Sequence, residues 1–126
     1  MATQNNVVGW FEIYVADMAR ARAFYQAVIQ REMSDLPGLP DMQMCAFNWV
    51  DKGEGASGAL VKSAKMGPGV GGTVVYFSCD DCAVEAARVA PAGGRLLQGK
   101  MAIGAYGFIA IVQDTEGNII GLHSRT

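Results

Sequence analysis

The sequence predicts an α+β protein in which two tandem βαβββ units form an open half barrel. Two observations predict this fold. A strand-like segment passes into a helix-like segment at an aspartate twice, at Asp17 and at Asp81. Each half then ends in strands whose final leucines correspond, Leu60 in the first half and Leu122 in the second. Internal duplication indicates a repeated architecture, and two such sheets set side by side would enclose a concave surface.

The first unit is predicted to cover residues 7–63. Val7–Val15 alternates β-branched and aromatic residues with other types, which is typical of a strand. Asp17 then caps a helix over Met18–Ile29, where apolar residues recur at steps of three and four. A short segment and two further strands complete the unit, at Glu32–Leu36, Met42–Val50 and Gly58–Ser63.

The second unit repeats this order over residues 73–124, after a glycine-rich linker at residues 64–72. Asp114–Asn118 is a turn signal between two apolar runs, since Gly117 and Asn118 both tolerate a positive φ. The predicted elements are a strand at Thr73–Asp81, a helix at Cys82–Ala90, a strand at Gly94–Gly99 and a hairpin at Tyr106–Ser124.

Length and charge exclude several classes of protein. A chain of 126 residues fits one domain that is large enough to bury a core without disulfides or a structural metal. A formal net charge of -2, with no basic cluster beside aromatic residues, argues against a nucleic-acid partner. No apolar run approaches the roughly 20 residues that span a bilayer, and the polar start at Met1–Asn6 is unlike a signal peptide. We therefore expect a cytoplasmic protein without a membrane partner.

The three cysteines are expected to be free thiols. Their number is odd, and no export signal precedes them. Cys79 and Cys82 have the spacing of a redox motif, but they bracket the second capping aspartate, and no second cysteine pair completes a zinc site. Buried thiols are the favoured interpretation.

The first strand has two unlike faces. Trp10, Glu12 and Tyr14 share one face, and the other face is apolar throughout. A carboxylate between two aromatic residues indicates either a solvated surface or the lining of a pocket.

Three segments of the chain resemble the vicinal oxygen chelate superfamily. They are FEIYVADMARARAFY near the start, SGALVKS in the middle and GFIAIVQDTEGNIIGL at the end. That group contains glyoxalase I, extradiol dioxygenases, fosfomycin-modifying enzymes and bleomycin-binding resistance proteins. The resemblance covers residues 7–124 and implies the fold, while the group hosts several unrelated chemistries. It also implies a homodimer, which open edge strands would favour.

In metal-dependent members of that superfamily, the ligands come from a histidine at the first strand of each unit and a glutamate or similar residue on the last. The matching positions here are Trp10, Val74, Ala59 and Gly121. None of these side chains ligates a divalent ion. We therefore predict that the usual metal site is absent and that no cofactor is bound.

The resemblance places Trp10 at a position that faces the cavity, so the face with Glu12 becomes the expected pocket. Aromatic walls with one carboxylate and one imidazole suit an uncharged or cationic organic ligand. The predicted ligand-binding residues are Trp10, Glu12, Tyr14, Phe47, Tyr76, Tyr106, Phe108 and His123.

Three functions remain open at this point. The first is a metal-free small-molecule binding protein of the glyoxalase/bleomycin-resistance type. The second is a glyoxalase-like lyase or isomerase that uses Glu12 and His123 as base and acid, or a displaced metal. The third is an interaction module that uses the same groove for a peptide or partner. The sequence does not decide whether the protein is an enzyme.

Each candidate residue also has a structural explanation. Glu12 could be a partly solvated strand carboxylate or part of an interface salt bridge. His123 lies three residues from the C-terminal end of the sequence, where a surface or dimer contact is the simpler role. Trp10 and Tyr14 fit equally well as core residues or as pocket lining.

Overall fold

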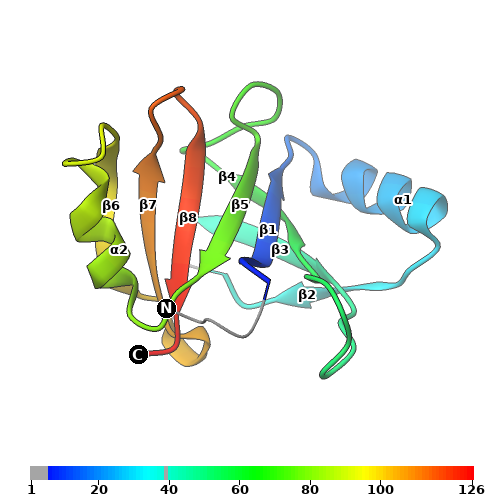
Figure 1. Cartoon of the computed structure of the whole chain (residues 1–126). Helices are drawn as coiled ribbons and strands as arrows, with labels where there is room; N and C mark the ends of the chain where they lie inside the picture. The colour runs from blue at the N-terminus through cyan, green and yellow to red at the C-terminus, as the bar shows by residue number, and fades with distance from the viewer. Residues whose placement is uncertain (1–5, 39) are drawn as a thin grey trace. The chain divides into compact units, whose positions relative to one another are not determined.

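The computed structural model describes residues 6–38 and 40–126 and confirms the α+β class with two βαβββ units (Figure 1). The polar segment Met1–Asn6 was interpreted above as unlike a signal peptide. All of this segment except Asn6 lies outside the described residues. The elements are β1 (Val8–Tyr14), α1 (Met18–Ile29), β2 (Met33–Leu36), β3 (Met42–Phe47), β4 (Ala59–Ser63), β5 (Thr73–Ser78), α2 (Cys82–Val89), β6 (Arg95–Ala102), the 3-10 turn η1 (Gly104–Tyr106), β7 (Phe108–Gln113) and β8 (Ile119–Ser124).

The chain divides into two compact parts. One is Trp10–Thr73, here called the first unit, and the other, here called the second unit, is Val74–Thr126 with residues 6–9. The start of β1 belongs with the second unit because the N–H of Ser78 donates to the carbonyl of Val7 at 2.8 Å.

Strand pairing repeats from one unit to the other. In the first unit the order is β2-β3-β4-β1, where β4 and β1 are parallel and Glu12 lies opposite Ala59. In the second unit the order is β5-β8-β7-β6, where β5 and β8 are parallel and Tyr76 lies opposite Gly121. The remaining pairs, β2–β3, β3–β4, β7–β8 and β6–β7, are antiparallel.

Both helices begin at the predicted aspartates. The Asp17 carboxylate accepts the N–H of Arg20 at 3.0 Å, and the Asp81 carboxylate accepts the N–H of Ala83 at 3.0 Å. Each bond satisfies a backbone donor that the first helical turn leaves without a partner. α1 ends at Gln30, whose left-handed backbone (φ 57°) closes the last turn. The helix over Met18–Ile29 is thus confirmed to the residue.

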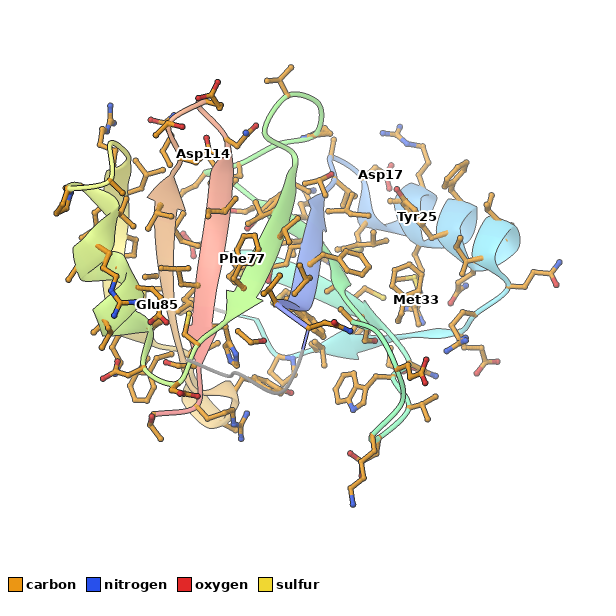
Figure 2. All side chains as sticks on the ribbon, viewed as in Figure 1. Asp17, Tyr25, Met33, Phe77, Glu85 and Asp114 are labelled. Atoms are coloured by element: carbon orange, nitrogen blue, oxygen red, sulfur yellow. The ribbon has the colours of Figure 1, made fainter. Side chains whose placement is uncertain are left out.

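Each unit has its own apolar cluster between its helix and its sheet. In the first unit Met33 and Tyr25 contribute, together with Leu60 (Figure 2). In the second unit Phe77 packs against a buried cluster that includes Leu122. These side chains mark the sheet face that each helix covers.

The two helices are buried to different extents. α2 buries Cys82 and Ala86, whereas α1 buries no residue completely and exposes Phe24, Val28 and Ile29 to solvent. Neither of the described helices has the length and apolar character needed to cross a bilayer.

Three strand ends differ from the prediction by three residues, and several other strand boundaries differ by one or two. β3 ends at Phe47 rather than Val50: the N–H of Asn48 makes one more bond in the β2–β3 register, to the carbonyl of Glu32, and a turn follows in which the N–H of Gly53 donates to the carbonyl of Val50. β5 ends at Ser78, before the capping aspartate. β6 runs to Ala102 instead of Gly99, with two register shifts against β7, and η1 was not predicted.

The predicted hairpin turn is confirmed, and its hydrogen bonds are local. Asp114 Oδ1 accepts the N–H groups of Glu116 and Asn118, both at 2.8 Å. Hydrogen bonds from Asn118 are the largest cause that lowers the pKa of the Asp114 carboxyl. Of the two residues expected to tolerate a positive φ, Gly117 adopts one (87°).

The prediction of buried, free thiols is confirmed at Cys45, Cys79 and Cys82. Burial, followed by the negative charge of Glu85, raises the pKa of the Cys79 thiol to about 11. A thiol with so high a pKa is protonated at neutral pH and is a weak nucleophile.

Candidate ligand-binding site

The two faces of β1 differ as the sequence indicated. Ile13 and Val15 belong to the apolar cluster under α1. Because strand side chains alternate, Trp10, Glu12 and Tyr14 lie on the opposite side of the sheet. We call this side, turned away from α1, the far face of the first unit.

Glu12 and Tyr14 form a polar pair on the far face. The Tyr14 hydroxyl donates to Glu12 Oε1 at 3.1 Å. Tyr14 is only 6% exposed, and Glu12 is half-buried. Burial, and then the charge and hydrogen bond of Glu12, raise the pKa of Tyr14 well above its ordinary value. Tyr14 therefore stays a hydrogen-bond donor at neutral pH, and its donation stabilises and orients the negative carboxylate.

Two tryptophans lie against each other beside this pair. The rings of Trp10 and Trp49 meet edge to face, with centroids 6.5 Å apart and planes at 76°. Trp49 is 52% exposed, so much of its indole remains accessible to solvent. Sequence reasoning missed Trp49, because it assigned this residue to β3 and not to the loop that follows.

A groove of about 400 Å³ lies next to Trp49. Its rim is polar, since the Ser34 hydroxyl donates to Asn48 Oδ1 at 2.6 Å. Met33 and Cys45 pack under α1, so their strand neighbours Ser34 and Ala46 lie on the far face. The lining residues are Ser34, Leu36, Ala46, Phe47, Asn48 and Trp49.

Strand register connects the groove to the carboxylate. Ser34 lies opposite Ala46, Ala46 opposite Ala59, and Ala59 opposite Glu12. These four residues form one row across the far face. Neighbouring strands are about 4.8 Å apart, which places Ala46 and Glu12 about 10 Å apart.

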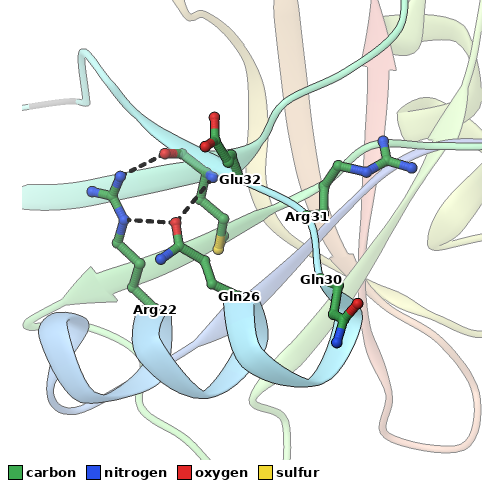
Figure 3. Close-up of a pocket in the computed structure, with 6 residues that line it drawn as sticks. Arg22, Gln26, Gln30, Arg31 and Glu32 are labelled. Carbon is green, nitrogen blue, oxygen red and sulfur yellow. Dashed lines mark hydrogen bonds between the residues drawn. The ribbon is translucent and has the colours of Figure 1, made fainter.

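A second groove, of about 420 Å³, lies between α1 and β2 (Figure 3). Two of its polar side chains, Arg22 and Gln26, already make hydrogen bonds within the protein. The Arg22 guanidinium donates to the carbonyl of Met33 at 2.5 Å, and Gln26 Oε1 accepts the N–H of Met33 at 3.1 Å. These side chains satisfy the backbone of the edge strand β2, so we interpret this groove as structural.

The second unit also carries predicted site residues on the sheet side turned away from α2. Tyr76 is buried, and its ring lies so close to Gly121 that an added Cβ would collide with it. His123 lies opposite Ser78 and is half-buried. Its Nε2 is 2.5 Å from the carbonyl oxygen of Tyr106. Because a carbonyl only accepts, this nitrogen carries the proton, which leaves Nδ1 as the acceptor in the neutral ring.

Two predicted site residues lie on the helix side of their sheets. Phe47 packs with the cluster under α1, its ring centroid 6.0 Å from that of Tyr25. Phe108 packs against the cluster under α2, and Lys100 Nζ lies 4.6 Å from its ring centroid. Phe47 does not share the face of Glu12, although it lines the edge of the groove.

The positions expected for metal ligands carry no ligating groups. They hold Trp10 and Ala59 in the first unit and Val74 and Gly121 in the second. Among residues 6–38 and 40–126, no three His, Cys, Asp or Glu side chains gather as a metal site.

Comparison with solved structures identifies the fold. Methylmalonyl-CoA epimerase from Mycobacterium tuberculosis matches with a TM-score of 0.70 at 18% identity, over 100% of this chain and 93% of that one. A variant of the Streptomyces coelicolor epimerase, in complex with 2-nitronate-propionyl-CoA, matches with a TM-score of 0.67 at 18% identity, over 94% and 95%. A hypothetical protein from Bacillus halodurans C-125 matches with a TM-score of 0.69 at 11% identity, over 94% of each chain.

The chain has the vicinal oxygen chelate fold. Identities this low show the fold alone, which supports many different activities. No protein-family model and no curated protein sequence matches the chain.

Proposed function

We propose that the protein binds a small organic cation on the far face of the first unit, without a metal ion. The observation that carries this proposal is the half-buried Glu12 carboxylate, held by Tyr14 beside the paired indoles of Trp10 and Trp49. Indole faces attract cations, and a partly desolvated carboxylate attracts them more strongly. Structural neighbours solved with coenzyme A thioesters support a small organic ligand as the kind of molecule that this fold takes.

Alternation of side chains supports a positive ligand charge. Glu12 is the one acidic or basic side chain that the described strands of the first unit place on the far face. Asp35 and Lys62 alternate to the other side, with Cys45 and Leu60. A ligand cation would therefore meet an oriented negative group in a largely apolar setting, where charge interactions are stronger than in water.

Titration with hexyltrimethylammonium, followed by the protein NMR spectrum, tests this function. Wild-type protein should bind the ion, and Glu12→Gln should weaken binding about tenfold or more while the melting temperature changes little. Gln43→Glu, which adds a carboxylate at an exposed position of β3 on the other side of the sheet, is the matched control and should bind as wild type. Equal affinity of wild type and Glu12→Gln would reject the proposal.

The second candidate is an isomerase in which Glu12 removes and returns a proton of a bound substrate. Epimerases among the structural neighbours favour it, since epimerisation requires removal and return of a proton. Incubating the protein with methylmalonyl-CoA in deuterated water tests it by mass spectrometry. Deuterium should enter the substrate with wild type and not with Glu12→Gln, and no incorporation by wild type would exclude this substrate.

We also propose that two copies of the chain associate. Leu96 and Leu97 of β6 are 47% and 41% exposed on a long edge strand, and α1 exposes three large apolar residues. Apolar surface of this kind is commonly covered by a partner. Analytical ultracentrifugation should give about twice the chain mass of 13.4 kDa, and a single-chain mass at micromolar concentration would contradict the dimer.

A further inference from the structure

We infer that the groove beside Trp49 is a subsite for a planar aromatic group, so that the ligand combines a cation at Glu12 with an aromatic ring about 10 Å away. This inference rests on the proposed function and adds a second recognition element. It concerns only residues of the first unit.

The groove has the size and lining for such a ring. Its volume of about 400 Å³ falls within the range of small-molecule sites, roughly 300–1,000 Å³. A much smaller apolar cavity, of about 150 Å³, already holds benzene in another protein. Leu36 and Ala46 provide apolar surface, and Trp49 provides an accessible indole on which a flat ring can stack.

The indole of Trp49 is also held in place. Its edge-to-face contact with Trp10 leaves the ring half-exposed and restricts its rotation, which lowers the side-chain entropy lost when a ligand stacks on it. At the rim, the Ser34 hydroxyl and the Asn48 amide bond to each other, which leaves the floor of the groove apolar. An aromatic ring would therefore displace water from apolar surface without breaking a buried polar contact.

The row from Ser34 to Glu12 sets the shape of the ligand. Two alanines, Ala46 and Ala59, are the members of this row between the groove rim and the carboxylate. Because these two side chains are only methyl groups, the surface of the far face is lower along this row than it would be with large side chains. A flexible chain lying along this row can join a ring in the groove to a cation at Glu12.

Two probes with the same cation and linker separate the subsite from the cation site. Hexyltrimethylammonium carries the cation alone, and its terminal naphthyl ether adds the flat ring. The ether should bind wild-type protein about tenfold or more tightly than the parent ion. The largest additional NMR shifts should be those of the Trp49 indole and of the Ser34 and Ala46 amides.

Variants then show which part of the protein provides the additional affinity of the ether. Ser34→Phe fills the groove from its exposed rim and should remove the advantage of the ether while binding of the parent ion is unchanged. Ser34→Ala controls for the lost hydrogen bond to Asn48 and should keep the advantage. Gln43→Phe adds the same ring on the other side of the sheet and should also keep it.

The outcomes distinguish the two proposals. Binding of the parent ion without an advantage for the ether, or an advantage that survives in Ser34→Phe, overturns the aromatic subsite and leaves the proposed function standing. If neither probe binds the wild-type protein, both proposals are wrong. Should Ser34→Phe fail to fold, Trp49→Ala takes its place, because a half-exposed loop residue is replaced at lower cost to stability. Trp49 also contributes to the cation site, so the readout is then the ratio of the ether's affinity to that of the parent ion, which should fall towards one.

Discussion

The two units share one backbone plan but place different chemistry on the sheet side away from the helix. Counted from the capping aspartates, the first unit has an indole, a carboxylate and a phenol where the second has an isopropyl group, a phenol and a hydroxyl. The corresponding pairs are Trp10 and Val74, Glu12 and Tyr76, and Tyr14 and Ser78. The two units thus share strand pairing and helix caps, while the side chains on the sheet side away from the helix differ between them.

A second difference lies beside these residues. Ala59 is the strand partner of Glu12, and Gly121 is the strand partner of Tyr76. In the second unit the Tyr76 ring occupies the space above Gly121, so this position is filled by the protein itself. In the first unit the corresponding position has a methyl group next to a carboxylate. We therefore expect the second unit to respond to substitution mainly in stability, and the first mainly in binding.

The largest expected effect follows from Gly121. Gly121→Val should lower the free energy of unfolding by about 3 kcal/mol, because its side chain collides with the buried Tyr76 ring. At the corresponding position of the first unit, Ala59→Gly removes a methyl group and should lower the free energy of unfolding by about 1 kcal/mol. Urea unfolding measures both. Equal losses would mean that the two positions are packed alike.

The next effect concerns the helix caps. Asp17→Ala should cost about 1 kcal/mol, since it removes the bond to the Arg20 N–H. Asp81→Ala should cost more, because the Asp81 carboxylate also accepts a hydrogen bond from Lys100 Nζ at 2.8 Å. Thermal unfolding of the two variants tests this order. A larger loss of stability in Asp17→Ala than in Asp81→Ala would contradict it.

Tyr14 predicts a pH effect in the first unit. Because its pKa is raised by folding, the phenol of Tyr14 loses its proton near pH 10 in the unfolded chain and only at higher pH in the folded protein. The stability that the protonated phenol contributes is therefore complete below about pH 10 and is lost as the pH rises further. Tyr14→Phe should lower stability by about 1 kcal/mol at neutral pH and lessen this alkaline loss. Ultraviolet titration of phenolate should show one fewer resistant tyrosine in the variant. An unchanged titration curve would place the resistant group elsewhere.

The smallest expected effect is a loss of stability at acid pH, which arises in the second unit. The hydrogen bond from Lys100 is the first cause that lowers the pKa of Asp81. Stability from the charged carboxylate is therefore present above the ordinary pKa, near 4, and is lost as pH falls through the lower folded value. Asp81→Asn should be less stable than wild type at pH 7 and nearly equal below pH 3. A constant difference between pH 7 and pH 3 would contradict this assignment.

How much of this could be predicted from sequence depended on whether the signal was local. The capping aspartates and the Asp114 turn make hydrogen bonds within four residues, and those elements were predicted correctly. The end of β3 depends on where its pairing with β2 and β4 stops, and its last bonds, from Phe47 to Gly58 and from Asn48 to Glu32, join residues far apart in the sequence. Trp49 was missed for that reason.

The same limit applied to the site residues. On β1 one face is apolar and the other is not, so alternation assigned Glu12 and Tyr14 to one side. On β3 and β7 both faces are largely apolar, and alternation alone could not show that Phe47 and Phe108 pack under the helices. The pocket roles proposed from sequence for Tyr76, Tyr106 and His123 remain predictions.

The central claim is that the first unit, and not the second, recognises the ligand. Its most direct test is NMR shift mapping during titration with hexyltrimethylammonium. We expect the largest shifts on the Trp10 and Trp49 indoles and on the Glu12 and Tyr14 amides, with saturation that Glu12→Gln weakens. Shifts centred on Tyr76 and His123, or no saturable shift at all, would contradict it.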